Sequence, residues 1–598
     1  MNYRNPLLLC VLFVVACSQE PQSESSASAP SSSGAPVSTK TADVIFHNAK
    51  IYTVDESRSW AQALAVKDGV IQTVGLTEDV MAYKGDATTV VDVGGRMVMP
   101  GIVDVHTHYE LGGLTGVQCW LPNTFENPTI DDVIAGIKEC DKRFPGNGWL
   151  YGNSFHANAI PPELYNSKWL DTIVADRPAQ MLDEPGHGYL LNSKALEIIR
   201  EKNGVTDDTQ SPEGGVVGKY ADGTLNGVFR STARKFLIEE PAPSYDDKVE
   251  AYTWAIQELY KHGTTAIMNP FSGSHMADNW WDGDLRAWKE AWNATSVQPR
   301  MDLCLFFGDG SYEPPSASRV LEVWDEANMP EEIKLCAKIY GDGVLEGGTA
   351  ALVENYANRD HNGSLGFAPA ELQALVTDID AAGIPIKVHA IGDRTVREVL
   401  NAYELVIEKR GGNPLRHHIA HITSVHPDDW SRFRRLDVPA EFIGSVAALI
   451  PYVEKGYYPA LGHDRFHLEM EPSGGILREG AVVAAVSDWG AALLDSMRSI
   501  QTVITRKDPN NQDSEVAGPM HRLDLPTAIA VHTINGAFIM RRENEIGSLE
   551  VGKQADLIVL DQNLFEIPED TIRDTRVLLT VIGGKKAWEP DGESWNLD

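Results

Sequence analysis

The sequence predicts an α/β protein built on a (β/α)8 TIM barrel, with an inserted subdomain after the first strand and a small β-sandwich formed by both termini. Three observations support this fold class. Short apolar strands alternate with helical stretches along most of the chain, which is typical of parallel β/α architecture. Eight such strands can be identified, the number that a closed parallel barrel requires. In addition, β-rich segments with glycine turns occur at both ends of the chain.

The predicted barrel strands follow one another through the middle of the chain. They are residues 102–105, 264–268, 301–306, 334–340, 385–389, 417–421, 438–443 and 481–486. The gap between the first two strands is far longer than one helix needs, so an insert is predicted at about 119–260. We expect it to lie over the barrel mouth. There, Trp149, Tyr151, Phe155 and Tyr189 would set the choice of substrate. A structural cap or a dimer contact is the alternative.

The β-sandwich is predicted from two segments that lie far apart in the chain, 42–99 and 544–590. In the first, Asp68-Gly69 is a hairpin signal between two apolar runs. The second has glycine turns, at 547 and 552, before a run typical of a buried strand. The barrel itself would then span 100–543.

The N-terminus carries targeting information. Residues 1–16 resemble a signal peptide, because Arg4 supplies a positive start and an apolar run over 7–16 follows. The run is too short to span a bilayer comfortably. It ends in small residues before Cys17, which resembles a bacterial lipobox, so we expect cleavage before Cys17 and lipidation of that cysteine. An ordinary signal peptide cut near Ala16, or a membrane anchor, is the alternative.

The segment that follows is predicted to be a flexible tether. Residues 17–41 are rich in Ser, Ala and Pro and have almost no large apolar side chains, so they cannot bury a core. A lipidated Cys17 with such a tether predicts a cell-envelope lipoprotein. Ser18 after the cysteine indicates, by resemblance, the outer membrane or the periplasmic face of a Gram-negative cell.

The net charge of the chain limits the kinds of molecule that we expect it to bind. The formal net charge is −34, so no basic excess is available to neutralise phosphates, and nucleic acid is not expected as a partner. The same charge argues against electrostatic docking on anionic lipid, which leaves the lipid anchor as the membrane contact. The expected ligand is a small-molecule substrate, and the sequence leaves open whether the chain forms a homodimer.

Besides the lipidated Cys17, four cysteines remain in the predicted mature protein, and none forms a CxxC pair that would indicate a zinc finger or a redox motif. Cys304 and Cys336 lie in apolar strand-like runs and are expected to be buried thiols. Cys119 and Cys140 can pair in an oxidising compartment, but the sequence leaves this pairing open.

The strongest local signal for chemistry is a pair of histidines after the first barrel strand. Along a strand, alternate residues point to the same side, so His106 and His108 can meet one metal ion. A lone HxH is common by chance. Here, however, it follows an apolar strand, at the carboxyl-terminal end where barrel active sites lie.

Four more polar residues occupy equivalent positions. Lys338 lies near the end of the fourth predicted strand, His389 ends the fifth, His421 ends the sixth and Asp488 follows the eighth. Each alone has a structural explanation, such as a solvated lysine or a helix-capping aspartate. Together at one rim they indicate a metal-binding constellation.

These residues resemble the amidohydrolase superfamily, and the flanking segments resemble its amidohydrolase-3 branch, which includes YtcJ-like proteins and N-substituted formamide deformylases. The matching segments are PGH at 185–187, NSKAL at 192–196, AKIYGDG at 337–343, HAIGDR at 389–394, RHHIAH at 416–421 and GKQADL at 552–557. Two departures lie beside the expected pocket. Ala420 replaces an acidic residue, and 441–445 lacks the usual Gln-Pro. Both bear on the substrate more than on the metal.

The resemblance implies a site for one or two divalent metal ions, most often Zn²⁺. His106, His108 and Asp488 would hold the more buried ion, and His389 and His421 the more exposed one. A water molecule activated by the metal would be the nucleophile.

The remaining roles are also implied by the resemblance. Lys338 would bridge two metals if CO2 carboxylated it, whereas an unmodified lysine would favour a single ion. Asp488 would act as general base and pass the proton to the leaving group. His187, on the insert, would polarise the carbonyl, with a structural histidine as the equal alternative.

The resemblance therefore predicts an enzyme, a metal-dependent amidohydrolase that cleaves the C–N bond of an amide, formamide or cyclic amide. The same site can attack the carbonyl of a lactone or ester, so a lactonase or esterase is the first alternative. A lipid-tethered binding protein on a catalytically dead barrel is the second. The intact set of six residues argues against the second alternative.

The lipid anchor yields the first testable prediction. The substitution Cys17→Ala removes the thiol that would carry the lipid, so the protein should move from the membrane fraction to the soluble fraction when cells are fractionated. A distribution unchanged by the substitution would contradict the anchor.

Overall fold

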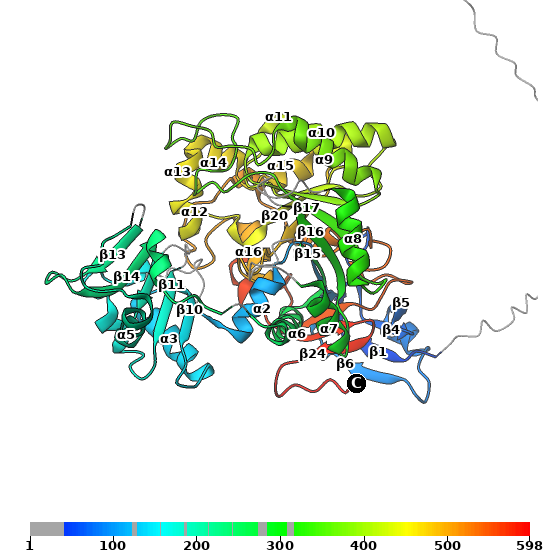
Figure 1. The fold of residues 1–598 in the computed structure, drawn as a ribbon. Helices are drawn as coiled ribbons and strands as arrows, with labels where there is room; N and C mark the ends of the chain where they lie inside the picture. The colour runs from blue at the N-terminus through cyan, green and yellow to red at the C-terminus, as the bar shows by residue number, and fades with distance from the viewer. Residues whose placement is uncertain are drawn as a thin grey trace, which may run out of the picture. The chain divides into compact units, whose positions relative to one another are not determined.

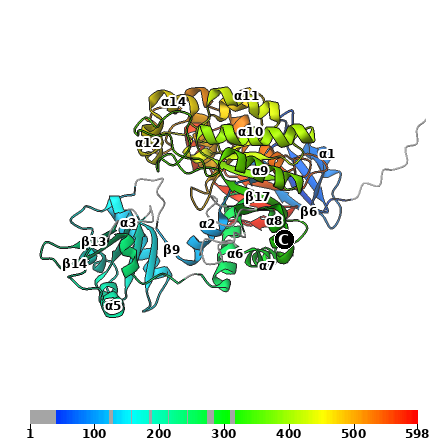
Figure 2. The ribbon, with the colours of Figure 1, turned by 45° about the horizontal axis from the view of Figure 1, so that its top comes forward.

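The structure is a computed structural model that describes residues 41–121, 128–155, 157–183, 188–212, 215–241, 243–272, 284–307 and 316–597 (Figures 1 and 2). The predicted signal peptide, Cys17 and most of the tether lie outside the described residues, and so does His187. Within the described part of the chain, no helix combines the length and the apolar character needed to cross a membrane.

An eight-stranded parallel sheet forms the centre of the protein and confirms the predicted barrel. Its strands neighbour one another in chain order. They are β8 (Ile102–Asp104), β15 (Thr264–Ser272), β16 (Arg300–Phe307), β17 (Lys334–Tyr340), β18 (Ile386–Ala390), β19 (His418–His421), β20 (Ala440–Ile443) and β21 (Val483–Val486). All eight sequence segments therefore form the expected strands.

The first and last strands approach each other beyond their carboxyl ends. The Ser487 amide donates to Asp104 Oδ1 at 3.2 Å, and the Asp488 amide donates to the His106 carbonyl at 2.9 Å. The His108 amide in turn donates to the Trp489 carbonyl at 2.8 Å. These bonds join the two ends of the sheet on the side where the candidate site residues lie.

Helices cover the outside of the strands, and Figures 1 and 2 show α9, α10 and α11 side by side. Those between the barrel strands are α6 (Tyr245–Lys261), α7 (Leu285–Ala294), α8 (Ala317–Ala327), α9 (Pro369–Ala381), α10 (Asp393–Arg410) and α11 (Pro427–Leu436). In α10, Val396, Val399, Leu400 and Tyr403 are fully buried, because residues three or four positions apart share one face of a helix. The helix ends at Gly411, which has a left-handed φ of 83°.

Further helices follow β20 and β21. Between β20 and β21 lie α12 (Pro451–Lys455), α13 (Tyr457–Leu461), α14 (His463–Glu469) and α15 (Ser473–Arg478). After β21 come α16 (Ser496–Thr505), α17 (Leu525–Val531) and α18 (Ile534–Ile539). The barrel core thus has a helical layer on its outer side along most of its circumference.

Strands from both chain ends form the smaller β-domain. One sheet contains β1 (Val44–His47), β4 (Ala63–Lys67), β5 (Val70–Gly75) and β6 (Thr89–Asp92), with α1 (Thr77–Met81) packed on it. The other contains β24 (Lys585–Trp588), β23 (Val577–Ile582), β22 (Leu557–Leu560), β7 (Met97–Pro100), β2 (Lys50–Tyr52) and β3 (Trp60–Ala61). Because β7 pairs directly with β22, the two ends of the chain share one sheet, as the sequence predicted (blue and red in Figure 1).

The insert has a sheet of its own (cyan to green in Figure 1). In spatial order its strands are β13 (Gly215–Lys219), β14 (Leu225–Ser231), β12 (Gly188–Leu191), β11 (Ala179–Asp183), β10 (Leu150–Phe155) and β9 (Cys119–Trp120). Its helices are α3 (Ile130–Arg143), α4 (Ser167–Asp171) and α5 (Ser193–Asn203), and α2 (Tyr109–Val117) precedes it. Helix α6 packs into the barrel core through Ala255 and Leu259, so we place the end of the insert before Tyr245.

Two disulfide bonds lie within the described residues. Cys119 and Cys140 are joined, with their Cα atoms 5.2 Å apart, which resolves the pairing that the sequence left open. Cys304 and Cys336 are also joined, so the expectation of two buried thiols was wrong. The residues are indeed buried, but they face each other in register on the neighbouring strands β16 and β17, which the sequence alone did not reveal.

The Cys119–Cys140 bond closes a loop between residues 21 positions apart that joins β9 to α3. Replacing both cysteines by serine should lower the free energy of unfolding of the insert by about 3 kcal/mol, because the unfolded chain regains the entropy of the open loop. Chemical denaturation of the variant and of the wild type measures this difference. Equal midpoints would show that the bond does not stabilise the insert.

Candidate metal centre

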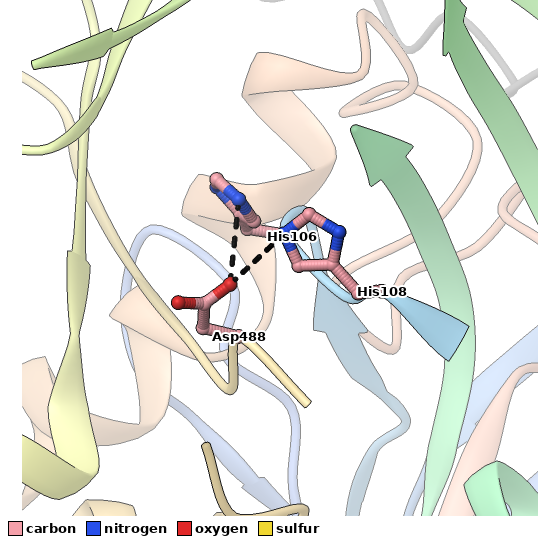
Figure 3. Close-up of side chains that lie close together, drawn as sticks. All are labelled: His106, His108 and Asp488. Carbon is pink, nitrogen blue, oxygen red and sulfur yellow. Dashed lines mark ion pairs between the residues drawn. The ribbon is translucent and has the colours of Figure 1, made fainter. Parts of the chain in front are cut away.

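Two of the six predicted site residues, both histidines, converge on one carboxylate oxygen of a third. His106 Nε2 lies 3.5 Å from Asp488 Oδ1, and His108 Nε2 lies 3.3 Å from the same oxygen (Figure 3). One ligand atom from each residue lies within 4.8 Å of the other two. Ligands bound at roughly 2.1 Å in a tetrahedron stand about 3.4 Å apart. The spacing of these atoms therefore fits a small divalent ion.

The other three residues continue the same cluster. Lys338 Nζ lies 3.2 Å from His106 Nε2. The ring of His421 lies 4.6 Å from that of His106 and 4.4 Å from that of His389, measured between centroids. The structure thus brings all six residues together at the carboxyl end of the barrel, as the sequence predicted, and their roles there remain proposals.

The surroundings of His106, His389 and His421 favour the neutral form that metal ligation requires. Burial lowers the pKa of His389 to about 3, and it lowers the pKa of His106 and His421 well below the usual value. The nearby Lys338 ammonium acts in the same direction on all three. A neutral ring carries a lone pair on one nitrogen, and that lone pair binds metal.

Two buried polar atoms at the centre support the fit of a cation. Asp488 Oδ1 and His421 Nδ1 are fully buried, and neither makes a hydrogen bond to any described residue. A buried polar atom without a partner costs about 1–3 kcal/mol, so such atoms rarely occur in clusters without a ligand. A divalent ion at this position would satisfy both.

The backbone at two of these residues has an uncommon conformation. His421 has a φ of 74° and Asp488 a φ of 53°, in the left-handed region that only a few per cent of non-glycine residues adopt, with His and Asp among those that adopt it most often. Each such residue costs of order 1 kcal/mol, and strain of this kind concentrates at functional sites. The left-handed backbone turns the side chains of His421 and Asp488 toward the cluster, at the carboxyl ends of β19 and β21.

Glu441, in β20, is a site residue that the sequence reasoning missed. Its carboxylate is completely buried, and Oε2 lies 3.0 Å from His106 Nδ1. An ionised carboxylate only accepts, so the His106 Nδ1–H donates to it and Nε2 keeps its lone pair facing Asp488. Glu441 therefore fixes the tautomer in which His106 can bind a metal.

Two neighbouring side chains keep Glu441 ionised. Lys387 Nζ lies 3.0 Å and His418 Nε2 lies 2.9 Å from its Oε1. Burial raises the pKa of this carboxyl, but the attraction of Lys387 and then of His418 outweighs it and holds the pKa below the usual value. Lys387 also donates to the Val105 carbonyl, just before His106. Glu441, Lys387 and His418 thus connect β18 and β19 to the chain segment that carries the histidine pair.

Asp342 organises the loop after His389. Its carboxylate accepts hydrogen bonds from the amides of Ile391 and Gly392 and from the amide of Ala351, each at 2.9 Å. Four donors, including the Thr395 hydroxyl at 2.7 Å, leave this buried carboxylate no capacity for a metal. We therefore assign it a positioning role rather than ligation.

Two further sequence expectations concern the insert. His187 lies outside the described residues, so its role stays a prediction. Phe155 is fully buried in the same cluster as Met181 and Leu190, so it does not line a pocket. Tyr151 and Tyr189, by contrast, line a cavity on the other face of the sheet.

A second group of possible metal ligands includes two histidines of α14. His463, His467 and Glu515 have ligand atoms within 4.8 Å of one another. However, the Gly518 amide donates to His467 Nδ1 at 3.1 Å, so in a neutral ring the proton sits on Nε2, 3.0 Å from Glu515 Oε1. That nitrogen has no lone pair for a metal, in contrast to His106.

Comparisons with known proteins agree with this geometry. The profile of the amidohydrolase family matches residues 89–587. YtcJ of Bacillus subtilis is 27% identical, over 91% of this chain and 99% of its own. N-substituted formamide deformylase of Arthrobacter pascens is 25% identical, over 93% and 100%. The crystal structure of a metal-dependent hydrolase from Pyrococcus horikoshii superposes with a TM-score of 0.65 at 20% identity, over 88% of this chain and 99% of that one.

The contact between Glu441 and His106 yields a prediction for metal affinity. Glu441→Gln keeps the shape but removes the charge that orients His106, so Zn²⁺ affinity should fall by about 10- to 100-fold. Competition with a chelator measures this change. Glu469→Gln is a matched control, because it removes a buried carboxylate bound to Ser424 instead. Equal losses in both variants, or no loss in either, would contradict the assignment.

Proposed function

The chain belongs to the amidohydrolase family, and from this premise we propose that it hydrolyses the C–N bond of an amide, formamide or cyclic amide at the centre around Asp488. As a member of this family it is a metal-dependent hydrolase that acts on carbon–nitrogen bonds. The observation that carries the proposal is the buried Asp488 oxygen shared by His106 and His108.

In the proposed arrangement, His106, His108 and Asp488 hold one divalent ion, with zinc as the preferred metal. His389 and His421 would hold a second ion where one is bound, and Lys338 would bridge the two ions if it is carboxylated. When bound, the metal lowers the pKa of a water molecule and polarises the substrate carbonyl.

Asp488 is suited to move the proton. Its pKa is affected first by burial, which raises it, but the interaction with His108, whose Nε2 lies 3.3 Å away, and the charge of Lys338 lower it below the usual value. At neutral pH it is therefore an anion that can accept a proton from water. The same carboxylate can then give that proton to the nitrogen of the leaving amine. Without this transfer, an amine anion would have to leave, which is unfavourable.

Lys338 is suited to carboxylation. Burial, and then the charge of Lys387, lower the pKa of Lys338 to about 7. A large fraction of this side chain is therefore a neutral amine near neutral pH, and only the neutral amine attacks CO2. The carbamate would replace a positive charge by an anionic ligand beside His106.

The amide substrate class is supported by the relative whose name records such a reaction, the N-substituted formamide deformylase, which matches this chain over nearly its full length. A screen of the zinc-loaded protein against N-substituted formamides, N-acyl compounds, cyclic amides and lactones tests the proposal. We expect hydrolysis in the nitrogen-containing classes. Turnover of lactones alone would favour the esterase alternative.

Asp488 gives the sharpest prediction for the reaction. The substitution Asp488→Asn keeps the shape of the side chain but removes its capacity to accept a proton. Turnover should therefore fall by about 100-fold or more, while KM changes much less. The variant is assayed for kcat, KM and bound zinc.

A helix-capping or purely structural role predicts a different outcome. Asparagine is itself a good capping residue, so such a role would leave kcat nearly unchanged. Near-normal turnover with metal still bound would therefore remove Asp488 from the mechanism.

A further inference from the structure

A cavity of about 350 Å³ lies on the insert, between one face of its sheet and the chain segment that follows the sheet. Strands β10, β11 and β12 supply one wall, and residues 237–241 supply the other. Of the described residues that line it, none belongs to the six-residue cluster at the barrel. Its volume is within the range of small-molecule pockets. The cavity is therefore a separate candidate site.

Strand pairing explains which side chains face this cavity. Tyr151 is in register with Gln180, and Leu182 is in register with Tyr189. Because side chains alternate along a strand, these four point to one face of the sheet. The residues between them, including Met181, pack into the core on the opposite face. The face that bears the cavity thus mixes aromatic and polar residues where a structural core would be apolar.

Two amide side chains in this cavity are nearly inaccessible to solvent. Asn153 is 2% exposed and Gln180 is 5% exposed. Gln180 Nε2 donates to the Ile238 carbonyl at 3.3 Å, which directs Oε1 away from that carbonyl. Across the described ranges, neither this Oε1 nor the buried Oε1 of Gln118 accepts a hydrogen bond. Buried acceptors of this kind normally have a partner, so both oxygens point to a ligand that donates hydrogen bonds.

The carboxylate of Glu240 is a third hydrogen-bond acceptor at this cavity, beside Gln118 and Gln180. Glu240 is partly buried, and the hydrogen bond recorded for its carboxylate is long, 3.5 Å from Asn153 Nδ2. Burial raises its pKa, as expected for an acid without a close positive partner. The other charged residues that line the cavity, Arg234 and Glu239, are exposed to solvent. A cation bound beside Glu240 would supply the missing partner.

Aromatic side chains provide the remaining surface. The rings of Tyr151 and Trp149 are stacked, with centroids 5.4 Å apart and an interplanar angle of 10°. The stack holds Tyr151 in place, and Tyr189 and Leu182 add apolar surface beside it. Aromatic faces attract cations and also bind flat apolar groups. The cavity thus combines an anionic, acceptor-rich end with an aromatic wall.

We propose that this cavity binds a primary ammonium ion carried on a small apolar body, such as a single aromatic ring. The ammonium group has three donors and no acceptor, which matches Gln118, Gln180 and Glu240. Its charge matches Glu240, and its apolar body matches the tyrosine wall. The inference does not depend on the reaction at the metal centre, because the two sites share no residue.

Isothermal titration calorimetry of the full-length protein tests the proposal, with benzylammonium chloride as the probe. Benzyl alcohol has the same ring without the charge, and sodium benzoate has the opposite charge. We expect benzylammonium to bind about tenfold or more tightly than benzyl alcohol, and benzoate not to bind. Equal binding of the three compounds, or no binding of benzylammonium, would overturn the proposal.

Substitutions test whether benzylammonium binds in this cavity. Glu240→Gln should weaken benzylammonium binding by about tenfold, because it removes the charge but keeps the shape. Gln180→Leu should also weaken it. Glu197→Gln is the matched control, because it removes an exposed carboxylate on α5, outside the cavity. That variant should bind as the wild type does.

Asp488→Asn distinguishes this cavity from the metal centre. If the proposal is correct, this variant binds benzylammonium normally. Loss of binding in Asp488→Asn together with normal binding in Glu240→Gln would place the probe at the metal centre and refute the cavity as an ammonium site.

Discussion

The site depends on one buried carboxylate, that of Glu441. Taking a carboxylate out of water costs several kcal/mol, and it remains charged here because Lys387 and His418 lie within 3.0 Å. In return, it accepts a hydrogen bond from the Nδ1–H of His106, so that Nε2 is left free for a metal. Removing either Glu441 or Lys387 would leave the buried charge of the other unbalanced directly under the candidate centre.

The parallel barrel makes this arrangement possible, because its strands end at the same rim. His389 and His421 reach the rim from β18 and β19, and the hydrogen bonds between the segments after β8 and β21 bring Asp488 beside His106. The left-handed backbone at His421 and Asp488 then turns both side chains inward. Fold and chemistry are thus connected through the ends of strands that are far apart in sequence.

The sequence was sufficient for the eight strands and the six clustered residues, because apolar runs and the polar residues that end them leave a local pattern. It did not reveal Glu441, whose role depends on contacts with His418, Lys387 and His106, which lie 23, 54 and 335 positions away in the sequence. It also missed the Cys304–Cys336 bond, which strand register creates. Phe155 was misjudged because a bulge in β10 interrupts the alternation before it.

The central claim is that a metal ion binds where His106, His108 and Asp488 converge. Anomalous diffraction at the zinc absorption edge, from crystals of the zinc-loaded protein, tests it most directly. The account predicts an anomalous peak within about 2.3 Å of His106 Nε2, His108 Nε2 and a carboxylate oxygen of Asp488. A peak only at His463, His467 and Glu515, or no peak near His106, would contradict it.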